Sequence, residues 1–138
     1  MLLTLWHTLW LGWRLGAEVI PLGASTPVST LGYVNAGLEL SQQIQAGLLP
    51  EPDRIYIPFA TGGTVAGLLI GLTCSQSRSK VVAVRTVEPI IANQTRLRRL
   101  IRQTLALLGL EPSGVPLCLS RLEFIPSGKL GRGLPSPG

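Results

Sequence analysis

Residues 55–72 read IYIPFATGGTVAGLLIGL: a β-rich run, a loop of small residues and an apolar run of helical character. Isoleucine, tyrosine and phenylalanine before the loop favour a buried strand, and VAGLLIGL after it favours a helix. In a parallel α/β sheet, ligands bind at the carboxyl ends of the strands. We therefore expect a site at the loop ATGGT, between this strand and this helix.

The loop ATGGT has the features of an anion-binding turn. Gly62 and Gly63 permit positive φ and let the backbone approach an anion without interference from a Cβ atom. The N–H groups that open the following helix can bind a phosphate, and Thr61 and Thr64 can add hydroxyl donors. The spacing matches neither the dinucleotide fingerprint nor the P-loop, so a simple chain reversal remains equally open at this point.

Strand-like and helix-like segments alternate on both sides of this stretch. We expect a short buried strand over residues 17–23, a helix capped at Ser29 or Thr30 and ending near Gly47, and a strand over residues 81–87. A further helix should start at Pro89, with apolar residues at helical spacing: Ile90, Leu97, Ile101, Leu105 and Leu108. This alternation predicts an α/β fold, a mostly parallel sheet with crossover helices.

The composition indicates one domain without a membrane-spanning segment. The chain has 138 residues, of which 46% are hydrophobic and 14% charged, enough to build a core. We divide it into an apolar helix (1–15), a core (16–110) and an irregular C-terminal segment (111–138). The first helix is shorter than the ~20 residues needed to cross a bilayer, so its tryptophans are expected to pack against protein, and no membrane partner is expected.

The net charge of +5 is concentrated in RLRRLIR, residues 96–102. No aromatic residue interleaves with these arginines to stack on bases, so we interpret them as a solvated helix face and expect no nucleic-acid partner. Cys74 and Cys118 belong to no cluster with metal-ligand spacing. They indicate reduced thiols and a cytoplasmic protein that holds no metal.

Four blocks, in this order, resemble the second half of the D-cysteine desulfhydrase and 1-aminocyclopropane-1-carboxylate deaminase family. They are VIPLGASTPVSTLGYVNAGLEL, PDRIYIPFATGGTVAGLLIGL, VVAVRTV and GRGLPSP. The resemblance implies part of the large domain of a fold-type-II enzyme similar to the tryptophan synthase β chain. It also implies pyridoxal 5'-phosphate (PLP) as cofactor and a small amino-acid substrate, D-cysteine or 1-aminocyclopropane-1-carboxylate. By position, the residues implied to hold the cofactor phosphate are Thr61, Gly62, Gly63 and Thr64.

The chain departs from this family in two respects. The family's Schiff-base lysine follows a Gly-Gly-Asn segment that this sequence lacks, and the two lysines present are Lys80 and Lys129. Lys80 precedes its predicted strand, at the end opposite the loop and about 20 Å from it. Arg132 stands where the desulfhydrases have a tyrosine in the tail. Two interpretations of the GAST loop, residues 23–26, are equally open: it lies at the rim of the site, or it is only a turn. We do not include it in the predicted site.

The sequence therefore predicts the C-terminal portion of a PLP-dependent lyase or deaminase, which holds the cofactor phosphate and is inactive alone. A homodimer, or an N-terminal polypeptide that complements the chain and brings the lysine, are the partners we consider. The alternative is a non-catalytic phosphate- or nucleotide-binding α/β module.

Overall fold

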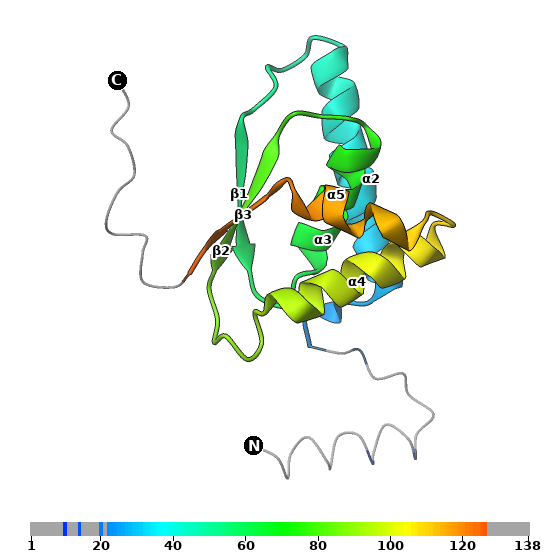
Figure 1. Cartoon of the computed structure of the whole chain (residues 1–138), viewed down its shortest axis with the longest axis vertical. Helices are drawn as coiled ribbons and strands as arrows, with labels where there is room; N and C mark the ends of the chain where they lie inside the picture. The colour runs from blue at the N-terminus through cyan, green and yellow to red at the C-terminus, as the bar shows by residue number, and fades with distance from the viewer. Residues whose placement is uncertain (1–9, 11–13, 15–19, 21, 127–138) are drawn as a thin grey trace.

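The computed structural model describes residues 10, 14, 20 and 22–126 of the chain (Figure 1). Helices and strands alternate after a short 3-10 turn, in the following order: η1 (Leu22–Ala24), α2 (Pro27–Gln45), β1 (Arg54–Phe59), α3 (Gly63–Cys74), β2 (Lys80–Arg85), α4 (Gln94–Leu107), η2 (Pro112–Gly114), α5 (Val115–Leu119) and β3 (Leu122–Ile125).

The three strands form one parallel sheet in the order β1-β2-β3. Ile57 of β1 is paired with Ala83 of β2, which is paired in turn with Phe124 of β3. Both crossovers step in the same direction along the sheet, so the helices gather on one of its sides, as Figure 1 shows. The predicted α/β fold with a parallel sheet is confirmed.

The core lies between the sheet and these helices. Phe59 is 1% exposed and packs edge-on against Phe124, with ring centroids 5.7 Å apart. Around this pair lie apolar side chains from both layers: Ile57, Val65, Ala66, Leu69, Ile70, Val81, Ala83, Leu97 and Ile101. The core therefore lies directly beneath the loop that joins β1 to α3.

Helices α2 and α3 pack at glycines rather than at large side chains. A Cβ atom placed on Gly67 would lie 2.4 Å from the Cβ atom of Tyr33, and one on Gly71 would lie 2.4 Å from the carbonyl oxygen of Val34. Gly37 faces Gly71 from the other helix, with a similar lack of space. This close approach fixes the start of α2 relative to the start of α3.

The N-cap of helix α2 lies three or four residues before the cap predicted at Ser29 or Thr30. Thr26 is the N-cap: its hydroxyl accepts a hydrogen bond from the Ser29 amide, and the Ser29 hydroxyl accepts one from the Thr26 amide. Pro27 then occupies the first helical position, where its missing N–H has no cost. The reciprocal capping box therefore outcompetes the later start.

Three other predictions need correction. Instead of a strand over residues 17–23, the described residues show an exposed Ile20 and a 3-10 turn. The helix expected from Pro89 begins at Gln94, because the Asn93 side chain caps the Arg96 amide, and Ile90 is exposed. The strand expected over residues 81–87 ends at Arg85, where its pairing with β1 ends.

The remaining predictions about the chain ends lie outside the described residues. They concern the tryptophan face of the N-terminal helix, apart from Trp10, and the tail with Lys129 and Arg132. Among the residues that the structure describes, no helix has the length and apolar character needed to cross a membrane. The same residues contain no group of metal-ligating side chains.

Candidate functional site

The loop after β1 opens helix α3 without a side-chain cap. Gly62 is the N-cap and has φ +96°, a left-handed conformation that residues with a Cβ atom rarely adopt. The first hydrogen bond of the helix runs from the amide of Ala66 to the carbonyl oxygen of Gly62. The amides of the first turn, Gly63 to Val65, therefore have no carbonyl partner within the helix.

These amides face a cavity of about 400 Å³ at the carboxyl end of β1. Its wall combines the ATGGT loop and the start of α3, the GAST turn, two residues of α2 and one of β1: Gly23, Ala24, Ser25, Ser29, Tyr33, Pro58, Ala60, Thr61, Gly62, Gly63, Thr64 and Val65. A cavity of this size is within the range that holds a small cofactor. The four residues predicted from the sequence, Thr61 to Thr64, thus lie together in its wall.

The GAST turn, which the sequence left open as a possible rim and which we did not include in the predicted site, forms the second wall of this cavity. Ser25 of the GAST turn donates a hydrogen bond from its hydroxyl to Thr61 Oγ1, at 2.6 Å, although the two residues are 36 positions apart. Tyr33 of α2 also lines the cavity and is 46% exposed. In the sequence, Ser25 and Tyr33 are marked only by their place in the block VIPLGASTPVSTLGYVNAGLEL. A contact over this sequence distance has no local pattern.

Among the residues that the structure describes, the lining of the cavity contains no carboxylate, lysine, arginine or histidine, so its electrostatics come from the backbone. The free amides of the first turn and the positive end of the α3 dipole favour an anion, each by about 0.5 kcal/mol or more. Hydroxyls of threonine and serine supply neutral donors. This arrangement can bind a phosphate, but it offers no acid or base of ordinary catalytic type.

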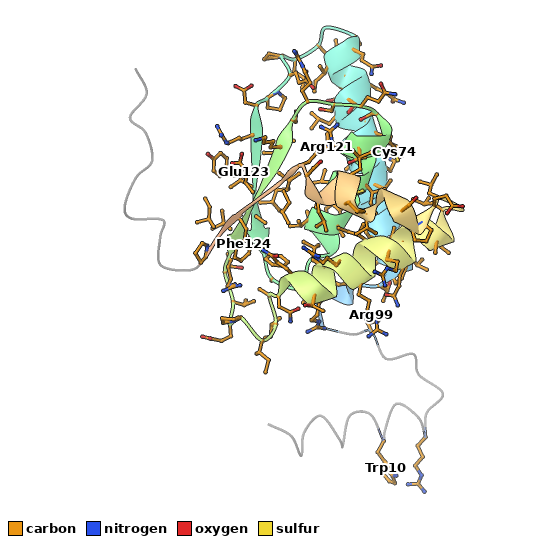
Figure 2. The ribbon with its side chains drawn as sticks, viewed as in Figure 1. Trp10, Cys74, Arg99, Arg121, Glu123 and Phe124 are labelled. Carbon is orange, nitrogen blue, oxygen red and sulfur yellow. The ribbon has the colours of Figure 1, made fainter. Side chains whose placement is uncertain are left out.

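Lys80 is engaged at the other end of the sheet, as its sequence position indicated. It is the first residue of β2, paired with Arg54, whereas Phe59 at the loop is paired with Arg85. Five residue steps at about 3.3 Å separate these two levels, roughly 17 Å. The Lys80 ammonium lies 3.1 Å from Glu123, whose pKa is lowered by hydrogen bonds from Arg54 and then from Lys80 (Figure 2).

A second polar cluster also lies away from the cavity. The carboxylate of Glu51 accepts hydrogen bonds from the Arg78 amide at 2.6 Å, the Ser77 hydroxyl at 2.8 Å and the Arg78 guanidinium at 3.0 Å. These bonds, led by the Arg78 amide, lower the pKa of Glu51 to about 2. The cluster ties the segment before β1 to the turn before β2 and so has a structural role.

The arginines of α4 are on the solvent side of that helix, as predicted. Arg96, Arg98, Arg99 and Arg102 are all exposed, and Arg99 projects from the helix in Figure 2. Leu97 and Ile101, in contrast, are buried in the core. The basic face therefore belongs to a surface that is separate from the cavity, and the absence of a nucleic-acid partner stays a prediction.

Comparison with known proteins finds several curated proteins that are similar to most of this chain. No family model matches the chain. It is 37% identical over 92 residues to "Nocardicin C-9' epimerase" of Nocardia uniformis and 34% identical over 76 residues to "D-cysteine desulfhydrase" of Klebsiella pneumoniae. These matches cover 67% and 55% of this chain. The chain is a relative of the D-cysteine desulfhydrase and 1-aminocyclopropane-1-carboxylate deaminase family.

The chain corresponds to only part of each relative. A protein of Pyrococcus furiosus that is named provisionally as a 1-aminocyclopropane-1-carboxylate deaminase is 28% identical over 115 residues, 83% of this chain but 34% of its own length. For the epimerase and the desulfhydrase the shared fractions are 28% and 22% of their lengths. The names of these relatives cover three different reactions: epimerisation, desulfhydration and deamination.

Proposed function

We propose that this chain holds the phosphate group of pyridoxal 5'-phosphate at residues Thr61, Gly62, Gly63 and Thr64. The observation that carries the proposal is the neutral cradle at the start of α3: free first-turn amides, a positive φ at Gly62 and an adjoining cavity of about 400 Å³. The relatives support it, because the desulfhydrase and deaminase reactions in their names are of the kind that PLP catalyses on amino acids.

The residues present fit the phosphate end of this cofactor. A Cβ atom on Gly62 would lie 3.2 Å from the ring of Phe59 and would require a left-handed conformation, so glycine keeps the backbone close to the anion. Thr61 and Thr64 lie on either side of the two glycines and can donate hydroxyl hydrogens. When bound, the cofactor would supply an electron sink for bonds to the α-carbon of an amino acid.

For the whole protein we propose a PLP-dependent lyase or deaminase acting on a small amino acid, D-cysteine or 1-aminocyclopropane-1-carboxylate. The chain positions the cofactor, whereas the Schiff-base lysine has to come from elsewhere than the sheet described here. Lys80 is engaged with Glu123 at the opposite end of β2, roughly 17 Å from the loop level. We therefore propose that the chain by itself is inactive and that its compartment is the cytoplasm.

A complementing polypeptide or a second copy of the chain is part of this proposal. The helices gather on one side of the sheet, and on the other side Tyr56 of β1 is 56% exposed. Since the relatives are about three times longer than the shared region, they contain further residues that could cover this side. Activity that returns when an N-terminal polypeptide of a relative is mixed with this chain would support complementation; activity of this chain alone would contradict it.

The alternative is a non-catalytic phosphate- or nucleotide-binding module. One observation favours it: in the described part of the chain, no acidic, basic or imidazole side chain lines the cavity. Such a module would bind inorganic phosphate or a nucleotide at least as tightly as PLP. Competition between these ligands, measured on the full chain, therefore separates the two functions.

The phosphate loop is tested by Gly63→Asp, which introduces a negative charge beside the free amides of the first turn and a Cβ atom that would lie 3.0 Å from Ser25 Oγ. We expect it to weaken binding of PLP, followed by absorbance or protein fluorescence, about tenfold or more, that is by at least ~1.4 kcal/mol. Gly114→Asp is the matched control, because Gly114 lies outside the cavity and its added Cβ atom would meet only Leu105, at 3.7 Å. Equal affinity of the Gly63→Asp variant and the wild type would overturn the proposal.

A further inference from the structure

The ATGGT loop does not stand alone, because the GAST turn before α2 reaches across to it. The Ser25 hydroxyl donates to Thr61 Oγ1 at 2.6 Å and approaches its second acceptor, the Gly23 carbonyl, only at 3.3 Å. Among the described residues, this hydrogen bond joins the two walls of the cavity directly. The bond therefore acts on Thr61, one of the residues proposed to hold the phosphate.

The GAST turn is held in place by α2. The Ala24 carbonyl accepts a hydrogen bond from the Thr26 amide at 2.8 Å and another from the Ser29 hydroxyl. Gly23 and Ala24 have φ values of +71° and +47°, and the second of these is costly for a residue with a Cβ atom. The capping box thus holds a turn whose backbone conformation is unfavourable in isolation. A turn that is fixed in this way is suited to presenting Ser25 in one orientation.

The space around Ser25 is equally restricted. A Cβ atom on Gly23 would lie 2.3 Å from Thr61 Oγ1, and a Cβ atom on Gly63 would lie 3.0 Å from Ser25 Oγ. Glycines on both sides thus let the serine hydroxyl enter the slot between Thr61 and Gly63. Any larger residue at either glycine would separate the two walls.

We infer that Ser25 is a positioning residue for the phosphate loop, an inference that rests on the proposed function. A hydroxyl has one hydrogen to donate. Because Ser25 donates its hydrogen to Thr61 Oγ1, the hydrogen of Thr61 remains free to be donated to the cofactor phosphate. The Ser25 bond also polarises the Thr61 hydroxyl, which makes it a stronger donor.

The test measures binding of PLP and of pyridoxal, which lacks the phosphate, to the full chain. We expect Ser25→Ala to weaken PLP binding about two- to tenfold, the usual net effect of one hydrogen bond, and to leave pyridoxal binding unchanged. Ser25→Cys keeps the slot filled with a poor donor, and we expect the same loss. In a Thr61→Ala background, Ser25→Ala should cause no further loss, because the serine acts through the threonine. Ser113→Ala, an exposed serine outside the cavity, is the control.

The outcomes separate this inference from the proposed function. If the wild type binds PLP, Gly63→Asp abolishes that binding, and Ser25→Cys binds as the wild type does, the positioning role is overturned while the phosphate loop stands. Additive losses from Ser25→Ala and Thr61→Ala would overturn it as well, and so would equal losses for PLP and pyridoxal. If the wild type binds PLP no better than pyridoxal, the inference and the proposed function fail together.

Discussion

The close packing of α2 on α3 makes Gly67→Ala a decisive substitution for this fold. The added Cβ atom would lie 2.4 Å from the Tyr33 Cβ, 2.7 Å from the Thr30 carbonyl oxygen and 2.9 Å from the Tyr33 carbonyl carbon. Two of these three atoms belong to the backbone, so a change of rotamer cannot relieve the contact. The helices must move apart, and the GAST turn at the start of α2 would move with them.

The size of the effect can be worked out from two opposing terms. Overpacking costs about 1–3 kcal/mol, and we take the upper end because backbone atoms are involved. Replacing glycine by alanine inside a helix returns about 1 kcal/mol. The expected net loss for Gly67→Ala is therefore about 2 kcal/mol, measured as the free energy of unfolding in urea by circular dichroism.

Gly32→Ala is the matched control in the partner helix. Gly32 lies inside α2, and a Cβ atom there meets nothing within 4 Å. It should therefore gain the helix term alone, about 1 kcal/mol, so that the same substitution has opposite signs at the two sites. If Gly67→Ala were as stable as the wild type, or if both variants shifted in the same direction, the glycine contact between α2 and α3 would be wrong.

Three further predictions concern stability and thiol reactivity. The pKa of Glu51 is lowered from 4.5 to about 2 by hydrogen bonds led by the Arg78 amide, so its stabilising effect is complete above pH 4.5 and is lost as the pH falls toward 2; melting temperatures over this range should fall more steeply for the wild type than for Glu51→Gln, and parallel curves would contradict this. Asn93→Ala removes the N-cap of α4 and should lower the free energy of unfolding by about 1 kcal/mol, whereas Asn93→Asp should retain it; equal stability of all three proteins would argue against the cap. Cys74 is exposed while Cys118 of α5 is buried, with its thiol pKa raised by that burial, so a thiol reagent should modify the first rapidly and the second only on unfolding; rapid modification of both thiols would contradict the burial of Cys118.

The sequence predicted the elements whose signals are local. The pattern of residues 55–72 predicts β1 and α3 with nearly their observed bounds. The reason is local: a run of β-branched and aromatic residues is followed by two glycines, which are typical of a turn. The starts of α2 and α4 were misplaced for a common reason. Each is set by a side chain that bonds to an amide three residues on, Thr26 and Asn93, and several neighbouring residues could have served as the cap.

Only the ATGGT half of the site could be predicted, again because only its signal is local. The ATGGT loop has a recognisable composition and follows a strand, whereas the contact between Ser25 and Thr61 depends on how α2 packs against α3. That packing is a tertiary feature, with glycines 30 or more positions apart along the chain. Segments that join distant residues in this way carry no periodic signal.

The relatives sharpen what the shared region can determine. An epimerase and a desulfhydrase match this chain with 37% and 34% identity, over 28% and 22% of their own lengths. Under the proposed function, this chain holds the cofactor rather than selecting one reaction. We accordingly expect the substrate to be chosen by residues beyond the cavity wall described here.

The central claim is tested most directly by titrating isotope-labelled full chain with PLP and following the backbone amides by NMR. The proposed phosphate loop predicts that the largest shifts occur at the free amides of Gly63, Thr64 and Val65, with smaller changes at Ser25 and Thr61. Pyridoxal should not reproduce these shifts. Largest shifts at the exposed arginines of α4 instead, or equal shifts with pyridoxal, would contradict the claim that this loop grips a phosphate.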